Sequence, residues 1–121
     1  MGRSSVYTGW VTDALREPTF LILTALAAKP QHGYGIVRDV EEISGGRVRL
    51  RAGTLYTALD RLSADEWVAV DREEVVDGRL RRYYRLTDLG AARLATEVER
   101  LRANTRAAER RLRARPIGGT A

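Results

Sequence analysis

Apolar residues recur at helical spacing in several stretches of the chain. The first stretch predicts a helix over about residues 12–28. Pro18 favours a start at residue 18 or a bend there, because proline fits a first helical turn better than an interior. After residues 29–35, a turn rich in proline and glycine, a shorter amphipathic helix is expected to end at Gly45-Gly46.

The stretch "GTLYTALDRLSADEW", residues 53–67, predicts a third helix. One apolar stripe follows the i, i+4, i+7 spacing: Leu55, Leu59 and Leu62. The other faces of its first two turns carry small or hydroxyl-bearing residues: Gly53, Thr54, Tyr56 and Thr57. Since these are poorer helix formers than Glu, Lys or Gln, the pattern indicates a surface that another molecule approaches closely.

An alternating pattern surrounds the third helix. Residues 47–51, "RVRLR", are expected to be extended. Residues 68–86 predict a β-hairpin, with Val68, Val70 and Arg72 on one strand face and a type I′ turn at Asp77-Gly78. The outgoing strand is acidic and the returning strand basic, so cross-strand ion pairs are expected to support the hairpin.

A long last helix is predicted from residue 87, capped by Thr87, to about residue 114. Its apolar stripe has the alternating 3 and 4 spacing of a heptad seam: Ala91, Leu94, Val98, Leu101, Thr105, Ala108 and Leu112. Such a helix is ~40 Å long. Because nothing else in this small chain can cover its far half, Leu94 and the later seam residues are expected to pair with a second copy.

The element order predicts the fold class. Three helices, a two-stranded hairpin and a further helix match a mainly helical α+β winged helix-turn-helix with a long C-terminal dimerisation helix. We therefore expect a flexible N-terminus over 1–9, a DNA-binding domain over 10–86, the dimerisation helix over 87–115 and a flexible tail over 116–121.

Composition narrows the function. The chain has 121 residues, no cysteine, a single histidine and a formal net charge of +5. His32 is interpreted as a turn residue rather than a metal ligand, and no cofactor, metal site or catalytic group is expected. No apolar run reaches the ~20 residues of a membrane span, and the N-terminus lacks a secretory signal, so a cytoplasmic protein is predicted. The basic excess favours an anionic partner such as nucleic acid.

In a winged helix-turn-helix the third helix enters the DNA major groove, where Gly53, Thr54 and Thr57 would permit close approach and hydrogen bonding. Several candidates keep two interpretations. Tyr56 contacts DNA or packs against the wing. Arg61 contacts a phosphate or pairs with Asp65. The wing arginines contact DNA or form cross-strand pairs: Arg79, Arg81 and Arg82.

Three motifs together resemble the PadR family of transcriptional regulators: "HGYGI" at 32–36, "GTLYTALDRL" at 53–62 and "YYRLTDLG" at 83–90. The resemblance covers roughly residues 15–112 and implies a homodimeric repressor that binds a pseudo-palindromic double-stranded DNA operator. The single C-terminal helix is similar to the small-subunit branch, in which that helix forms the dimer.

The chain departs from the family pattern at two places. Glu66-Trp67 stands where the family usually has Gly-Leu after the third helix. Arg51 stands where a Ser or Asn cap is usual, and since arginine caps poorly and binds phosphate well, it is interpreted as a DNA contact.

A repressor needs a release signal, and the chain has no second domain to receive one. We therefore expect a small planar aromatic effector at the dimer centre, walled by Trp10, Ala91, Leu94 and Val98. The alternative function is a winged-helix module that binds protein without specific DNA readout, because the fold alone does not decide function.

Overall fold

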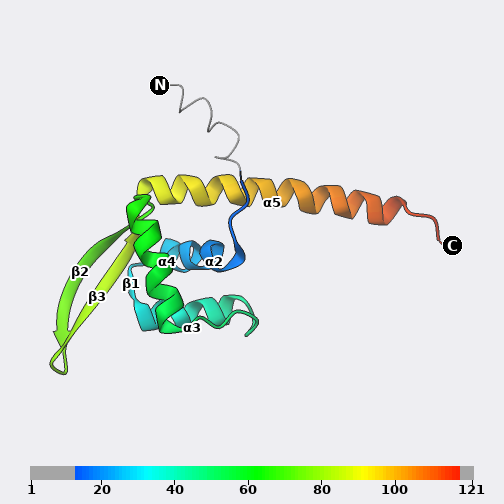
Figure 1. The fold of residues 1–121 in the computed structure, drawn as a ribbon. Helices are drawn as coiled ribbons and strands as arrows, with labels where there is room; N and C mark the ends of the chain where they lie inside the picture. The colour runs from blue at the N-terminus through cyan, green and yellow to red at the C-terminus, as the bar shows by residue number, and fades with distance from the viewer. Residues whose placement is uncertain (1–12, 118–121) are drawn as a thin grey trace, which may run out of the picture.

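Three short helices form the body of the molecule, with a β-hairpin at one end and a long helix across the body (Figure 1). The computed structural model describes residues 13–117. The elements are α2 (Glu17–Ala28), β1 (Gln31–His32), α3 (Gly33–Ile43), α4 (Ala52–Ala64), β2 (Val68–Val76), β3 (Arg79–Leu86) and α5 (Asp88–Ala114). The expectations for residues 1–9 and 118–121, and the position of Trp10, lie outside the described residues.

The first predicted helix is shorter than expected. Residues 13–16 are not helical, and α2 begins at Glu17 with Pro18 in its first turn. Proline suits this position because the amide that it lacks would have no partner there. Most apolar residues of α2 are buried and form the centre of the core with Ile36 and Val40 of α3 and Leu59 of α4, whereas Phe20 is only partly buried.

The third predicted helix also ends earlier than expected, at Ala64 rather than residue 67. The Trp67 amide donates to the Leu62 carbonyl over 2.9 Å, and the Glu66 amide donates to the Ser63 carbonyl over 3.0 Å. Together these bonds form a Schellman motif, which requires a left-handed residue after the helix. Glu66 occupies that position with φ 65°. The exit from α4 therefore keeps the geometry that glycine usually provides.

The predicted hairpin is present, with its turn at Asp77 (φ 53°) and Gly78 (φ 76°) as a type I′ turn requires. A register shift between Val70 and Arg72 interrupts the expected alternation: Val68 and Val70 pair with Leu86 and Tyr84, but Arg72 pairs with Tyr83 and lies over its ring, away from the face that it was expected to share with the two valines. Residues 31–32, expected to lie in a turn, form a short third strand: β1 pairs with β3 in the sheet order β1-β3-β2. Residues 47–51 belong to neither a helix nor the sheet.

The long helix α5 begins as predicted. Thr87 caps it, with its Oγ1 accepting from the Gly90 amide over 3.0 Å, and the same Oγ1 donates to the Glu66 carbonyl over 2.6 Å. Gly90 lies so close to α4's exit that an added Cβ would stand 2.1 Å from the Trp67 carbonyl oxygen. The C-terminal half of α5 extends beyond the helical body (Figure 1). Among residues 13–117, none of the helices is long and apolar enough to cross a membrane.

Candidate nucleic-acid interface

The N-terminal half of α4 is an exposed ridge. Gly53, Thr54 and Thr57 are exposed, and a Cβ added to Gly53 would meet nothing within 4 Å. Arg51 is the N-cap residue, yet its side chain makes no capping hydrogen bond and is open to solvent. The first turn of α4 therefore presents small side chains, free backbone amides and one positive charge to any molecule that approaches it.

A groove on one side of this ridge separates α4 from the segment that leads into α2. Its α4 wall contains most of the predicted contacts on that helix: Gly53, Thr54, Thr57 and Arg61. The opposite wall includes Leu15, Pro18 and Trp67. Within the described chain no ion pair joins Arg61 to Asp65, although they are one helical turn apart. The Arg61 guanidinium is thus exposed beside the hydroxyl-bearing face.

A second groove lies on the other side of the ridge, between α4, the start of α3 and the wing. It brings Tyr56 together with the wing arginines that the sequence singled out: Arg79, Arg81 and Arg82. Tyr56 is 45% exposed, and its hydroxyl points toward Gly33, where an added Cβ would stand 2.3 Å from it. The Tyr56 ring therefore packs against the start of α3 and remains accessible from the wing groove, and its contact with DNA stays a prediction.

The three wing arginines differ in what they contact. Arg82 Nε lies 2.7 Å from Glu73 Oε2, its cross-strand partner, and this bond raises the pKa of Arg82 further. Arg81 faces Glu74 across the hairpin, but Glu74 instead accepts from the Tyr83 hydroxyl over 2.9 Å. In the part of the chain that the structure describes, Arg79 and Arg81 form no ion pair. Of the three predicted wing contacts, these two arginines are available to a phosphate.

His32 holds the start of α3 against the wing. Its Nδ1 accepts from the Gly35 amide over 3.3 Å, so His32 caps the helix, and its ring meets Tyr83 edge-on with centroids 5.3 Å apart. Burial, and then the charge of Arg81, lower the pKa of His32, whereas Glu74 opposes them. The neutral ring is therefore favoured, as a cap whose Nδ1 accepts a hydrogen bond requires. Among residues 13–117, no three potential metal-binding side chains cluster.

Comparison with known proteins identifies this arrangement. The model of the transcriptional regulator PadR-like family matches residues 22–96. The chain belongs to that family. It is therefore a DNA-binding transcriptional regulator and not an enzyme, as the three motifs predicted, and the single long C-terminal helix agrees with the small form of PadR-like chain.

Relatives and solved structures agree with this assignment. A Lysinibacillus sphaericus protein of unassigned role is 32% identical over 79 residues, which cover 65% of this chain and 72% of that one. "Transcriptional regulator Rv3488" of Mycobacterium tuberculosis is 46% identical over 57 residues, 47% of this chain and 52% of its own. A PadR family regulator from Clostridium difficile has the same fold with TM-score 0.67 and 24% identity, covering 80% of this chain and 99% of that one.

The structure of Bacillus subtilis PadR in complex with operator DNA has a TM-score of 0.58 and 21% identity. The match covers 88% of this chain and 54% of that one. At this identity the likeness concerns the fold.

The predicted dimer seam of this PadR-like protein is only partly covered by its own body. Leu94 packs against the core, and Val98 is half-buried in an apolar hollow that Phe20 also lines. Farther along, Leu101 is 38% and Leu112 is 63% exposed, and Thr105 and Ala108 are also exposed. Of the expected effector wall, Ala91 is exposed, whereas Leu94 is turned toward the core of its own chain.

Two structural residues of this PadR-like chain could not be singled out from the sequence. Gly33 matters through its contact with Tyr56, twenty-three positions away, which no local pattern reveals. Glu97 is 1% exposed on a helix whose neighbours Thr96 and Glu99 are exposed. Its spacing to Arg93 and Arg100 could have indicated ion pairs, but its burial depends on residues 13–15, far away in the sequence.

Proposed function

We propose that the protein acts as a homodimeric repressor that binds a pseudo-palindromic operator. In this proposal each protomer inserts the first turns of α4 into the major groove and lays its β2–β3 wing along the neighbouring backbone. The observation that carries the proposal is the exposed ridge of α4, which is small at its tip and has an arginine-bearing groove on either side.

The chemistry of the ridge suits both parts of DNA recognition. Thr54 and Thr57 offer hydroxyls that can donate to or accept from base edges, whereas Arg51 and Arg61 carry charges suited to phosphates. On the wing side, Tyr56 lies in one groove with Arg79 and Arg81. A duplex that covers the ridge would meet these groups from both of its strands. The Bacillus subtilis relative crystallised with operator DNA supports this use of the fold.

The dimer is supported by the uncovered seam of α5. Leu101, beside the hollow that Phe20 lines, and Leu112, near the C-terminal end of α5, are both exposed. The C-terminal half of the helix extends past the body (Figure 1). A second copy can bury this stripe against its own, in the manner of a coiled coil. Replacing both Val98 and Leu101 with Glu is expected to give monomers in sedimentation velocity. A dimer that persists in this variant would show that another surface holds the protomers together.

Operator binding is tested with duplex DNA from the region upstream of the protein's own gene, where an inverted repeat with half-sites about one helical turn apart is expected. The protein should bind it with nanomolar affinity in physiological salt and bind a scrambled duplex about 10³-fold more weakly. Equal affinity for both duplexes would favour the alternative, a winged-helix module that recognises protein.

Release from DNA is proposed to follow binding of a flat, apolar aromatic compound at the dimer centre, walled by Trp10, Ala91 and Val98; Leu94 is left out of this wall because it packs against its own core. Such a ligand lowers operator affinity only as far as it prefers one dimer form to the other. Tryptophan fluorescence is titrated with a panel of planar aromatic compounds, with Trp10→Phe as the control. Quenching in the parent but not in the variant is expected. Unchanged fluorescence and unchanged operator affinity across the panel would remove the effector site.

A further inference from the structure

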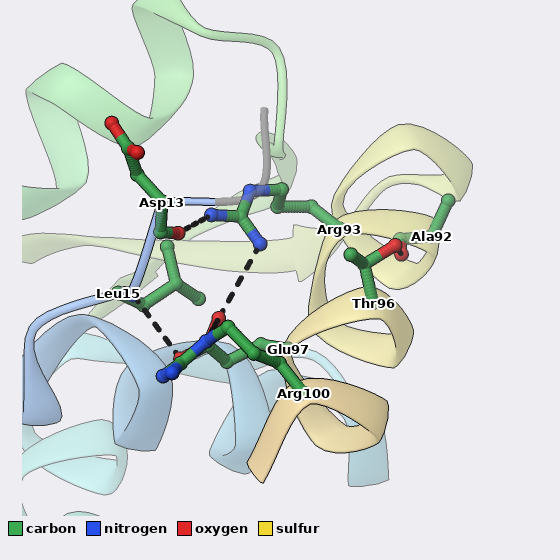
Figure 2. Close-up of polar contacts among 7 residues, drawn as sticks. All are labelled: Asp13, Leu15, Ala92, Arg93, Thr96, Glu97 and Arg100. Carbon is green, nitrogen blue, oxygen red and sulfur yellow. Dashed lines mark hydrogen bonds and ion pairs between the residues drawn. The ribbon is translucent and has the colours of Figure 1, made fainter. Parts of the chain in front are cut away.

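Glu97 is buried on the side of α5 that faces the body, and three partners surround its carboxylate (Figure 2). Arg100 contacts it twice: Nε donates to Oε1 over 3.1 Å and Nη2 donates to Oε2 over 2.5 Å. The Leu15 amide donates to Oε2 over 3.2 Å, and Arg93 Nη1 lies 3.7 Å from Oε1 as an ion pair. The bond from Arg100 is the main reason why the pKa of Glu97 lies below its ordinary value, and the carboxylate is charged at neutral pH.

This cluster joins three elements of the chain. Leu15 lies two residues before α2, so its bond fixes the entry of α2 against α5. Arg93 donates to the Asp13 carbonyl, and its guanidinium carbon lies 5.5 Å from the centroid of the Trp67 ring, just past the end of α4. One turn of α5 is thereby tied to the start of α2 and to the exit of α4.

These ties differ in kind from the apolar contacts around them. The packing of Leu94 against the core is non-directional, so it permits small rotations of α5 over the body. Hydrogen bonds and a buried ion pair depend on both distance and angle. Thr87 holds the start of α5 by hydrogen bonds, and the Glu97 cluster, farther along the helix, is the directional contact that fixes the angle at which α5 leaves that point.

We propose that Glu97 is a positioning residue that sets the angle between the dimerisation helix and the DNA-reading body, and so sets the operator spacing that the protein accepts. The inference rests on the proposed dimer. In a two-fold dimer the recognition helices stand ~34–36 Å apart, so each lies about 17 Å from the axis, and a rotation of about 5° moves it by about 1.5 Å. Such a shift disrupts hydrogen bonds to base edges in both half-sites.

The angle can be measured without DNA. Because the chain has no cysteine, Val75→Cys, at an exposed wing position, gives one spin-label site in each protomer. Pulsed dipolar spectroscopy then reports the distance between the two wings of a dimer. Glu97→Gln is compared with Glu99→Gln, its matched control, which removes an exposed pair with Arg102 on the same helix.

The labelled parent and the Glu99→Gln variant should give one narrow distance distribution, and Glu97→Gln a broader or shifted one. If Glu97→Gln does not fold, Arg93→Met serves instead, because it keeps the Arg100 and Leu15 bonds and removes the ion pair with Glu97 together with the ties to Asp13 and Trp67. An unchanged distribution in the folded variant overturns the inference and leaves the dimer intact. A parent without any dipolar signal refutes the dimer and the inference with it.

Operators with one base pair added to or removed from the spacer give the functional readout. The parent and Glu99→Gln should bind these operators about tenfold or more weakly than the natural spacing. Glu97→Gln should lose most of that preference. If Glu97→Gln weakens binding to every operator equally and keeps the preference for the natural spacing, Glu97 serves stability alone. That result would overturn the positioning role.

Discussion

The phenol of Tyr56 fills the space that a side chain at residue 33 would need. A Cβ on Gly33 would lie 2.3 Å from the Tyr56 hydroxyl oxygen and 2.9 Å from the ring carbon that bears it. Gly33 opens α3, and its φ lies outside the left-handed region, so alanine suits the backbone there. The glycine is therefore required by its neighbour on α4 and not by its own conformation.

Gly33→Ala is expected to displace the Tyr56 ring and weaken operator binding by about 2- to 12-fold, the value of one neutral hydrogen bond of ~0.5–1.5 kcal/mol. The fold should survive, because the ring is the free end of a flexible side chain. In a Tyr56→Ala background the same change should have no further effect on affinity, measured by fluorescence anisotropy. Additive losses in the double variant would show that Gly33 acts on DNA binding independently of Tyr56.

Arg51→Ser should change stability and DNA binding in opposite directions. Serine can cap the first turn of α4, where Arg51 makes no capping bond, and should raise the free energy of unfolding by about 1 kcal/mol. Loss of a phosphate contact should weaken binding to all duplexes and lower the slope of log affinity against log salt by about 1. Urea denaturation and a salt titration measure the two effects. An unchanged salt slope would remove Arg51 from the DNA interface.

His32 is predicted to make stability depend on pH. Its folded-state pKa is lowered, mainly by burial and then by Arg81, with Glu74 opposing, so the unfolded chain binds the proton more readily. The cap is then fully effective above the unfolded pKa, about 6.5, and is lost as the pH falls through the lower folded value. His32→Asn keeps a capping oxygen that does not titrate. Between pH 7.5 and 5 the parent should lose more unfolding free energy than this variant; parallel curves would contradict the prediction.

Glu66→Gly should stabilise the protein. Glu66 holds a left-handed conformation with φ 65°, which costs a residue with a side chain roughly 1 kcal/mol relative to glycine. The Schellman bonds are made by backbone amides and are retained. Glu66→Ala keeps the Cβ and is the matched control, with little change expected. If both variants are equally stable in thermal unfolding, the backbone at residue 66 is not strained.

Most helices and the hairpin could be predicted because their signals are local. The leucine stripe of α4 and the Asp77-Gly78 turn depend on residues close together in the sequence. The end of α4 could not be placed, because a glutamate in the left-handed region does not mark a helix end as glycine does. Strand β1 was missed because two residues carry no alternation, and its pairing with Tyr83 and Tyr84 arises from the tertiary fold.

The sequence could name candidate residues of the site, but it could not give their arrangement in space. The spacing on α4 and the charges of the wing identified Thr54, Tyr56 and Arg81. The sequence could not show that the α4 ridge divides these residues between two grooves, because that division depends on how residues 14–19 and the wing lie beside the helix. Nor could the sequence show that Arg82 forms an ion pair with Glu73, whereas Arg79 forms none in the described residues.

Thr87 closes the base of the hairpin. Its amide donates to the Trp67 carbonyl over 3.0 Å and its hydroxyl donates to the Glu66 carbonyl, so the chain leaves α4 and enters α5 at one hydrogen-bonded point. Beyond the register shift at residues 70–72, the paired strands of the outer hairpin extend from a base that is already fastened. Changes in its length or side chains need not disturb the helices on either side. In the proposed DNA complex, the outer wing can therefore change its contacts with DNA while the helices stay as they are.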